Sequence, residues 1–306
     1  MANAGAALNK DLERSPMVEE LHFRSDNAFL CLLLNRRCKQ IRVIDFRAGA
    51  LPAKRLFIQS VAQRENVEKV IILVEKDEVS SWTRVGFVRE GTVPGFYKRS
   101  DGHLVGCVIS DKTASVEVSD ATQRAVERTI NAAKKRTEGV GEVIKGVVLK
   151  GIDVKAAEKA RDAVWKKGPE ALGTFDSFGR DALRLYLETT PQKGKANYLS
   201  AEFQECFGHA LIEILRIPKT DPDILAVTAA LRSFNEELTR REIVSAFAFA
   251  PYDNVELATA FVAAGFRKTG LLAKGVLSPT GRTDAILWSR KLADPSGGGP
   301  AADDDA

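Results

Sequence analysis

Two glutamates and a tyrosine are the residues of this chain whose types and positions suit proton transfer. Glu202 and Glu213 lie in two apolar runs that read as central strands, and Tyr252 lies in a Pro-Tyr-Asp-Asn break. A carboxylate fixed on a strand can act as a general base, and a phenol can act as a general acid. The alternative for each glutamate is a solvent-facing strand position, because half-exposed sheets alternate polar and apolar residues. The alternative for Tyr252 is an ordinary turn residue.

The stretch Glu242–Leu292 supplies the elements around Tyr252. An apolar run at 243–250 predicts a strand, and the break after it leads into a short helix. That helix carries apolar residues at amphipathic spacing and ends at a glycine, Gly265. Two further strand-like runs follow, divided by the turn sequence Ser-Pro-Thr-Gly at 278–281. The order is therefore strand, turn, helix, strand, turn, strand.

This order resembles the C-terminal half of a GNAT-superfamily acyltransferase. Asn254 stands eleven residues before Gly265, as in that family's N-x-x-A-x-x-x-Y-x-x-x-G-F pattern. The chain departs from the pattern at two positions: Leu257 stands at the alanine and Phe261 at the tyrosine that usually protonates the leaving thiolate. A generic β-α-β unit is the alternative interpretation.

A weak internal repeat extends the resemblance to the first part of the chain. Four pairs of positions match at one offset of 179 residues: Gly86-Phe87 with Gly265-Phe266, Gly91 with Gly270, Gly102 with Gly281, and Trp82 opposite Phe261. We interpret this as two GNAT-like units in tandem, the first of them truncated.

Within that superfamily, the chain resembles the β-lysine N-acetyltransferases, which carry a partial unit before a full one. The match is the segment RVGFVREGTVPGFY at 84–97, followed by Asp101-Gly102, and the segment SAEF at 200–203. The resemblance implies transfer of an acetyl group from acetyl-CoA to a small-molecule amine, similar to β-lysine, in the cytoplasm. It covers the chain loosely from Val18 to Leu292.

The loop that should hold the cofactor departs from the family. The family has R/Q-x-x-G-x-G/A there, whereas Arg216–Asp223 reads RIPKTDPD and has no glycine. The resemblance places acetyl-CoA along this loop and the following helices, which gives these candidate cofactor-binding residues: Ile217, Lys219, Thr220, Asn254 and Phe261. We expect Thr220 or Asp221 to cap the next helix, which would occupy the N–H groups that a phosphate needs. Two aspartates there would also repel a phosphate.

Two kinds of function therefore stay open. The first is an active acetyltransferase. The second is a catalytically inactive GNAT-fold protein that binds a ligand or a protein partner. Aminoacyl transfer, which tandem GNAT-like units also perform, is a third interpretation. A homodimer is compatible with any of them.

Composition and sequence patterns argue against several other kinds of function. The formal charge of +4 among 306 residues gives no argument for a nucleic-acid partner. Four cysteines without paired spacing and only three histidines predict no metal site. The chain has no signal-peptide pattern and no apolar run of about 18 residues, so we expect no membrane span.

The predicted fold class is α+β, with mixed, mostly antiparallel sheets flanked by helices. The predicted divisions are a disordered start (1–17), a partial unit (18–111), a helical connector (112–141), a full unit (142–293) and a disordered acidic tail (294–306). In the full unit we expect a strand at 142–150, helices at 154–167 and 180–189, strands at 198–204 and 210–217, and a helix at 222–239, with one early strand missing or very short.

Overall fold

The computed structural model describes residues 16–25, 28–45, 49–109, 116–204 and 206–293. Its strands are β1 (Val18–Ser25), β2 (Ala28–Asn35), β3 (Gln40–Ile44), β4 (Lys69–Val74), β5 (Val88–Val93), β6 (Gly102–Val108), β7 (Val147–Gly151), β8 (Leu183–Pro191), β9 (Asn197–Gln204), β10 (His209–Ile214), β11 (Ser245–Pro251), β12 (Arg267–Ser278) and β13 (Gly281–Lys291). Its helices are α2 (Leu51–Arg64), α3 (Val79–Arg84), α4 (Asp120–Thr137), α5 (Val154–Lys167), α6 (Asp221–Arg240) and α7 (Val255–Ala263).

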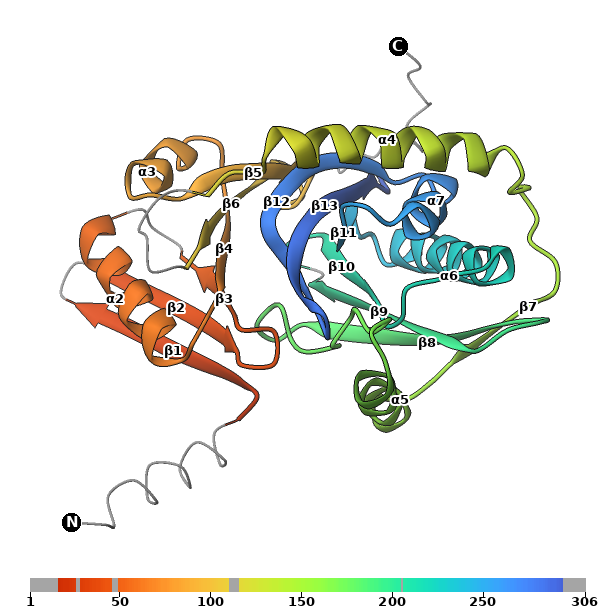
Figure 1. Ribbon diagram of the computed structural model, residues 1–306. Coiled ribbons are helices and arrows are strands. Elements are labelled where there is room, and N and C mark those ends of the chain that lie inside the picture. The colour runs from red at the N-terminus through yellow and green to blue at the C-terminus, as the bar shows by residue number, and fades with distance from the viewer. Residues whose placement is uncertain (1–15, 26–27, 46–48, 110–115, 205, 294–306) are drawn as a thin grey trace.

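All the strands join one mixed sheet with helices around it (Figure 1). Across the sheet the order is β1-β2-β3-β4-β6-β5-β12-β13-β11-β10-β9-β8-β7. Two neighbouring pairs are parallel, β3 with β4 and β10 with β11, and the others are antiparallel. The predicted α+β class, with a mostly antiparallel sheet flanked by helices, is confirmed. The predicted disordered ends lie almost entirely outside the described residues.

The two halves of the sheet have the same strand order and directions. From its outer edge inward, the first half runs β1-β2-β3-β4-β6-β5, and the second half runs β8-β9-β10-β11-β13-β12. In each half, one helix connects the two parallel strands and a second, shorter helix follows. The second half has β7 and α5 in addition. Where the halves meet, β5 pairs with β12.

The long helix α4 connects the halves and covers their junction. Ser119 accepts a hydrogen bond from the N–H of Thr122 at the start of this helix, as the sequence predicts. The helix runs along the top of the sheet from β5 to α7 (Figure 1). Its buried side chains, Val126 and Ala133, join the core of the second half. α6 and α7 lie on this side of the sheet, whereas α5 lies beyond β8 on the other side (Figure 1).

The core of the second half also takes side chains from the first. Ile71, Leu73, Val93, Phe96 and Leu104 belong to the same buried cluster as the residues of β10, β11, α6 and α7. A separate cluster fills the first half beneath α2 and α3. Because the larger cluster contains residues of both halves, the two halves share a hydrophobic core and are not independent domains joined by a linker.

One predicted element is wrong. The segment 180–189, expected to be a helix, is a turn at 180–181 followed by most of strand β8, which begins at Leu183. Its leucines at 183, 185 and 187 alternate with Arg184, Tyr186 and Glu188, and that period of two suits a strand and not a helix. The early strand that seemed to be missing is therefore β8. The predicted strand at 142–150 is also shorter, since β7 starts at Val147.

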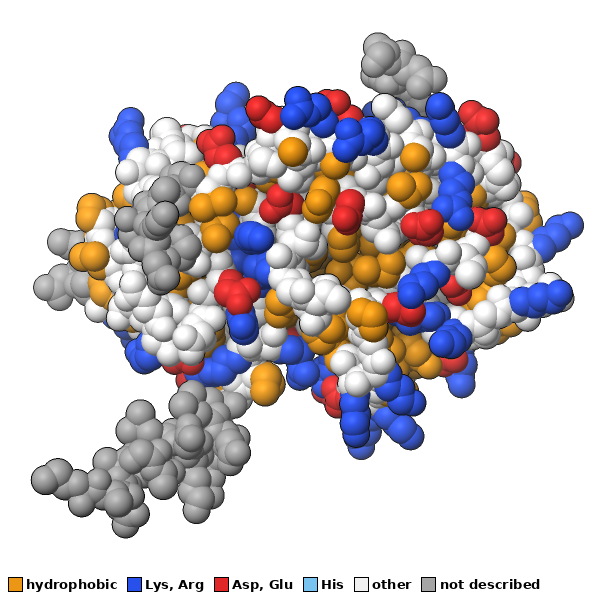
Figure 2. All heavy atoms as spheres, in the orientation of Figure 1, with side chains coloured by type: hydrophobic (Ala, Val, Ile, Leu, Met, Phe, Trp, Pro, Cys, Tyr) orange, Lys and Arg blue, Asp and Glu red, His pale blue; other side chains and the backbone are white. Residues whose placement is uncertain are grey.

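The face of the molecule shown in Figure 2 carries no large area of a single charge. Figure 2 shows Lys and Arg side chains interspersed with Asp and Glu over the viewed face, with several cations around α5 below. Hydrophobic atoms gather in a hollow near the middle of this face, between α4 and α7 above and α5 below (Figure 2). No described helix combines the length and the hydropathy needed to cross a membrane.

Candidate functional site

The parallel strands β10 and β11 separate after a short paired stretch. Their ladder joins His209–Leu211 to Ser245–Phe247 and goes no further. A cavity of about 110 Å³ opens where they part. Its walls include Ile212 and Ile214 from β10, Phe249 from β11 and Phe261 from α7. We call it the splay cavity. A gap between diverging strands exposes backbone and side chains to a ligand without disturbing the rest of the sheet.

Glu213 is the predicted base that lines the splay cavity. Its Oε1 accepts hydrogen bonds from the backbone N–H of Thr174 at 3.1 Å and of Phe175 at 3.3 Å. Its Oε2 lies 2.7 Å from Nη1 of Arg184. Burial raises the pKa of the Glu213 carboxyl above its usual value, while Arg184 acts in the opposite direction. The Glu213 side chain is 17% exposed, so the residue is partly buried and does not occupy a fully solvent-facing strand position.

Glu202 is also buried, with 5% of its surface exposed, so the solvent-facing alternative is wrong here too. It accepts hydrogen bonds from the N–H groups of Phe178 and Gly179 and forms an ion pair with Arg184. Arg184 thus bridges the two glutamates that the sequence singles out. However, Glu202 is not among the residues that line the splay cavity. Its contacts hold the loop before β8 in place, which is a structural role.

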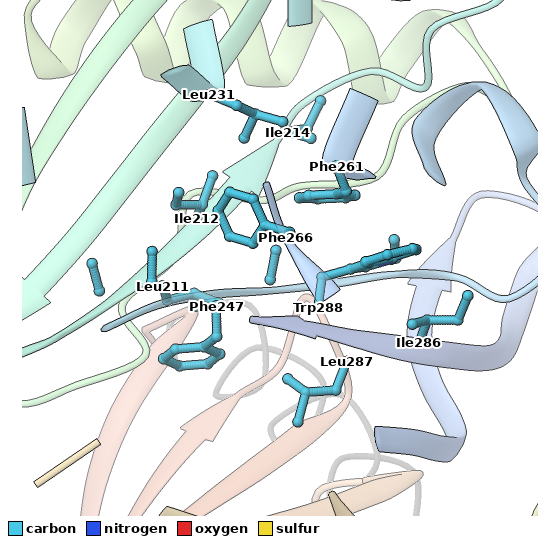
Figure 3. Packing of buried hydrophobic residues seen from close by; sticks show 14 of the residues in the cluster. Leu211, Ile212, Ile214, Leu231, Phe247, Phe261, Phe266, Ile286, Leu287 and Trp288 are labelled. Atoms are coloured by element: carbon cyan, nitrogen blue, oxygen red, sulfur yellow. The ribbon is translucent and has the colours of Figure 1, made fainter. Parts of the chain in front are cut away.

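The two aromatic candidates lie in different surroundings. Phe261 is 1% exposed, stacks on Trp288 with ring centroids 5.4 Å apart, and packs edge-on against Phe266 (Figure 3). It reaches the cavity wall but has no proton to give. Tyr252 is half-buried against the core after β11 and does not line the splay cavity.

The start of α6 is closed by its own side chains. Thr220 caps the helix, as predicted, and forms a capping box with Asp223. The Asp223 carboxylate accepts from the N–H groups of Lys219 at 3.3 Å and Thr220 at 3.2 Å, while the N–H of Asp223 donates to Thr220 Oγ1. Pro222 has no N–H. The N–H groups of Lys219, Thr220 and Asp223 are therefore occupied, and the residues present do not fit a pyrophosphate at this helix end.

The remaining cofactor candidates also have structural partners. Asn254 caps α7, because its Oδ1 accepts from the N–H of Leu257 at 2.7 Å. Lys219 pairs with Glu170 at 2.6 Å, and the N–H of Ile217 donates to the Glu170 carbonyl at 2.9 Å. Neither Asn254 nor the loop 217–220 lines the splay cavity. The cofactor-binding roles of these residues stay predictions.

Sequence reasoning missed the outer wall of the splay cavity, which the first half of the chain supplies. Asn35, Cys38, Gln40 and Arg42 line it, together with the loop 172–178 and Arg282 from β13. Asp176 on that loop pairs with Arg37 at 3.1 Å and accepts from Asn35 Nδ2 at 3.2 Å. These partners are more than 130 residues apart in sequence, so no local pattern could have indicated the contact.

The described residues also contain one cluster of metal-ligating types, Glu20, His22 and Cys31 on β1 and β2. Glu20 is already paired with Arg180 at 3.0 Å. We assign no function to this cluster.

Comparisons with known proteins give remote similarities only. No protein-family model and no curated protein sequence matches the chain. Among solved structures, the spermidine N-acetyltransferase of Vibrio cholerae in complex with CoA and spermine is similar over 50% of this chain and 99% of its own, with 11% identity and a TM-score of 0.38. The ribosomal-protein alanine N-acetyltransferase of Escherichia coli is similar over 52% of this chain and 99% of its own, with 17% identity and a TM-score of 0.35. We therefore argue function from the chain's own geometry.

Proposed function

We propose that the chain is a GNAT-type N-acetyltransferase that acts on a small primary amine in the splay cavity. The observation that carries this proposal is the partly buried carboxylate of Glu213, whose side chain is 17% exposed, on the wall of a cavity between two diverging parallel strands. The amine lies in that cavity, and acetyl-CoA is its acetyl donor.

Glu213 performs the proton transfer in this proposal. A protonated amine cannot attack a carbonyl, so a base must first take its proton. Burial raises the pKa of Glu213, which brings its proton affinity closer to that of an amine than an exposed carboxylate would allow. The neutral amine nitrogen then bonds to the acetyl carbon, its second proton passes to solvent, the C–S bond breaks, and CoA leaves as the thiolate. Because Phe261 has no proton to give, solvent protonates that thiolate.

The chain also divides into two related units in this proposal, at 18–111 and 142–293. Support comes from the identical order and directions of β1-β2-β3-β4-β6-β5 and β8-β9-β10-β11-β13-β12. Among its described residues, the first unit has no counterparts of β7 and α5, in agreement with a truncated copy. It contributes one wall of the splay cavity through β2 and β3.

A second function has one observation in its favour. Asp223 occupies the N–H groups at the start of α6, where the GNAT resemblance places the CoA pyrophosphate. A chain with that end closed could bind an amine in the splay cavity without transferring an acetyl group to it. This alternative is a ligand-binding or protein-interaction module with the same fold.

Two measurements separate these functions. The first is calorimetric titration with acetyl-CoA, backed by a melting curve, since ligand at 100 times its Kd adds about 2.7 kcal/mol to the free energy of unfolding. The second is CoA release with β-lysine, lysine and spermidine as amines. For an enzyme, Glu213→Gln should lower the rate by roughly 10²–10⁴-fold, while Glu158→Gln, on the exposed face of α5, should leave it unchanged. A folded protein that binds no acetyl-CoA at millimolar concentration would instead support the second function.

A further inference from the structure

Arg42 is a buried cation that packs against the second half of the chain. No described carboxylate is in contact with its guanidinium. It is 9% exposed and lies on β3, against the loop before β8. Its Nη1 donates to the Phe178 carbonyl, and its guanidinium lies 3.9 Å from the centre of the Phe178 ring. Among the described residues its Nε has no hydrogen-bond partner, and no carboxylate forms an ion pair with it. Burial lowers the pKa of Arg42 to about 10, and the nearby charge of Glu202 offsets this only in part, so an anion in direct contact would stabilise the guanidinium.

The carboxylates around Arg42 form ion pairs with other arginines. Glu202 and Glu213 pair with Arg184. Asp176 pairs with Arg37 and lies 3.7 Å from Arg161. Arg184 faces two of these carboxylates, Arg161 also pairs with Asp162, and Arg42 is the arginine of this group that contacts no described carboxylate.

The guanidinium lies on the wall of a second, larger cavity as well as of the splay cavity. This second cavity, which we call the Arg42 cavity, has a volume of about 290 Å³. It opens where β3 and β4 end their parallel pairing, after Val43 and Ile72. Its position in the first half thus corresponds to that of the splay cavity in the second. The volume is close to the lower end of the range for small-molecule sites, about 300 Å³.

Aromatic side chains form one part of the wall of the Arg42 cavity. Phe96, Tyr97 and Phe207 line it, and the rings of Phe96 and Tyr97 meet edge-on at 4.8 Å. His209 adds a neutral ring, since burial lowers its pKa to about 3. Among the charged groups at this cavity, Asp45 is paired with Lys54 and Arg180 with Glu20. Asp181 also lies on the wall, and its carboxylate would repel a bound anion.

We propose that the Arg42 cavity binds a small organic carboxylate with a flat apolar body. The carboxylate pairs with the guanidinium of Arg42, and the apolar body packs on the rings of Phe96, Tyr97 and Phe207. The larger volume favours this cavity over the splay cavity for such a ligand. This site shares Arg42 with the wall of the splay cavity, but its test uses no acetyl-CoA and reads out at a residue of the Arg42 cavity alone.

Cys206 provides a readout specific to this cavity. It lines the cavity and is exposed, whereas Cys31 and Cys107 are buried and Cys38 belongs to the splay cavity. A bound ligand should therefore protect Cys206 from alkylation by iodoacetamide, followed by mass spectrometry. The probes are phenylacetate, 3-phenylpropionate and hexanoate at about 10 mM, with phenylacetamide as the uncharged match and inorganic phosphate as the bare anion.

We expect saturable protection of Cys206 by at least one carboxylate probe and none by phenylacetamide or phosphate. Arg42→Met should weaken that binding by about 30-fold or more, because it removes a buried charge partner. Arg42→Lys, which keeps a charge, should weaken it less. Arg240→Met, an exposed arginine on α6, is the matched control and should change nothing.

Several outcomes would overturn the proposal. Equal protection by phenylacetamide would mean that charge is not recognised, and protection by phosphate alone would mean a bare anion site. Unchanged binding in Arg42→Met, or no protection by any of the three carboxylates, would also reject it. Should Arg42→Met fail to fold, the comparison of phenylacetate with phenylacetamide on the unaltered protein decides the charge requirement.

Discussion

Gly91 and Gly270 face each other where the two halves of the sheet meet. They are the paired residues of β5 and β12, and they occupy equivalent positions at the repeat offset of 179 residues. A Cβ built on Gly270 would lie 2.3 Å from the Glu90 carbonyl oxygen and 2.5 Å from the Gly91 Cα. A Cβ on Gly91 would lie 2.9 Å from the Gly270 Cα. Only glycine at both positions permits this approach of the two backbones.

Gly270→Ala should therefore destabilise the junction. The added methyl group meets backbone atoms, which cannot move aside as a side-chain end can. We expect the free energy of unfolding to fall by about 2 kcal/mol or more, as for overpacked cores. Gly151→Ala is the control, because a Cβ there meets nothing within 4 Å, and it should change stability by less than about 0.5 kcal/mol. Urea unfolding of both variants measures the difference. Equal stability of the two would show that β5 and β12 can separate freely.

The buried ion pair Lys69–Glu90 stabilises the same junction between the two halves of the sheet. Lys69 Nζ forms an ion pair with Glu90 and donates to the Ala273 carbonyl at 2.7 Å, and the Ala273 N–H donates to Glu90 at 3.1 Å. Lys69→Met should cost about 3–5 kcal/mol, because it leaves a buried carboxylate without a partner. The double change with Glu90→Leu should cost less than Lys69→Met alone. Lys39→Gln, which breaks the exposed pair with Glu68, is the control and should cost at most about 1 kcal/mol.

Much of this fold is encoded in local sequence patterns. Alternating or continuous apolar runs predict β2, β4, β9 and β11, and caps such as Ser119, Asp153 and Thr220 mark the starts of three helices. β8 is the exception: its leucine alternation is clear, but Arg184 and Glu188 also suit a helix. Their side chains are accommodated by partners on other strands, such as Glu213 for Arg184, which local propensity does not include.

The candidate site was less predictable than the fold. The position of Glu213 on a central strand pointed to a base, and the structure places it at a cavity. Its burial could not be foreseen, because Arg184 and the N–H groups of the loop at 174–175 compensate its charge from a distance. Arg42 and its neighbours reach the wall of the splay cavity only because the two halves of the chain pack together. The periodic pattern of apolar residues within each half does not predict how the halves pack.

Acid should weaken the structure through His209. Its ring stacks on Phe96 at 3.7 Å, its Nδ1 lies 3.1 Å from the Phe96 carbonyl oxygen, and burial lowers its pKa from 6.5 to about 3. The unfolded chain takes up a proton as the pH falls through 6.5, and the folded chain does not until about 3. The contribution of the neutral His209 ring to the free energy of unfolding is therefore fully present above pH 6.5. Between pH 6.5 and about 3 this contribution falls by about 1.4 kcal/mol per pH unit.

His209→Phe isolates this contribution. The variant keeps a ring on Phe96 but cannot be protonated, so its stability should fall less between pH 7 and pH 5 than that of the unaltered protein. His22→Gln, at an exposed position on β1, is the control and should keep the original slope. Urea titrations at the two pH values measure both slopes. Parallel slopes in all three proteins would contradict a neutral, buried His209.

Asp223→Ala tests whether the start of α6 is closed to phosphate by its own carboxylate. The change frees the N–H groups of Lys219 and Thr220 and removes a negative charge 3.9 Å from Arg216. We expect it to cost about 1 kcal/mol of stability, as loss of a cap does, and to raise the affinity for acetyl-CoA several-fold in calorimetry. Asp153→Ala is the matched control: it removes the cap of α5, at a similar cost, and should leave acetyl-CoA binding unchanged. If Asp223→Ala instead weakens acetyl-CoA binding, the carboxylate contributes to the cofactor site, and the capping box does not compete with the pyrophosphate.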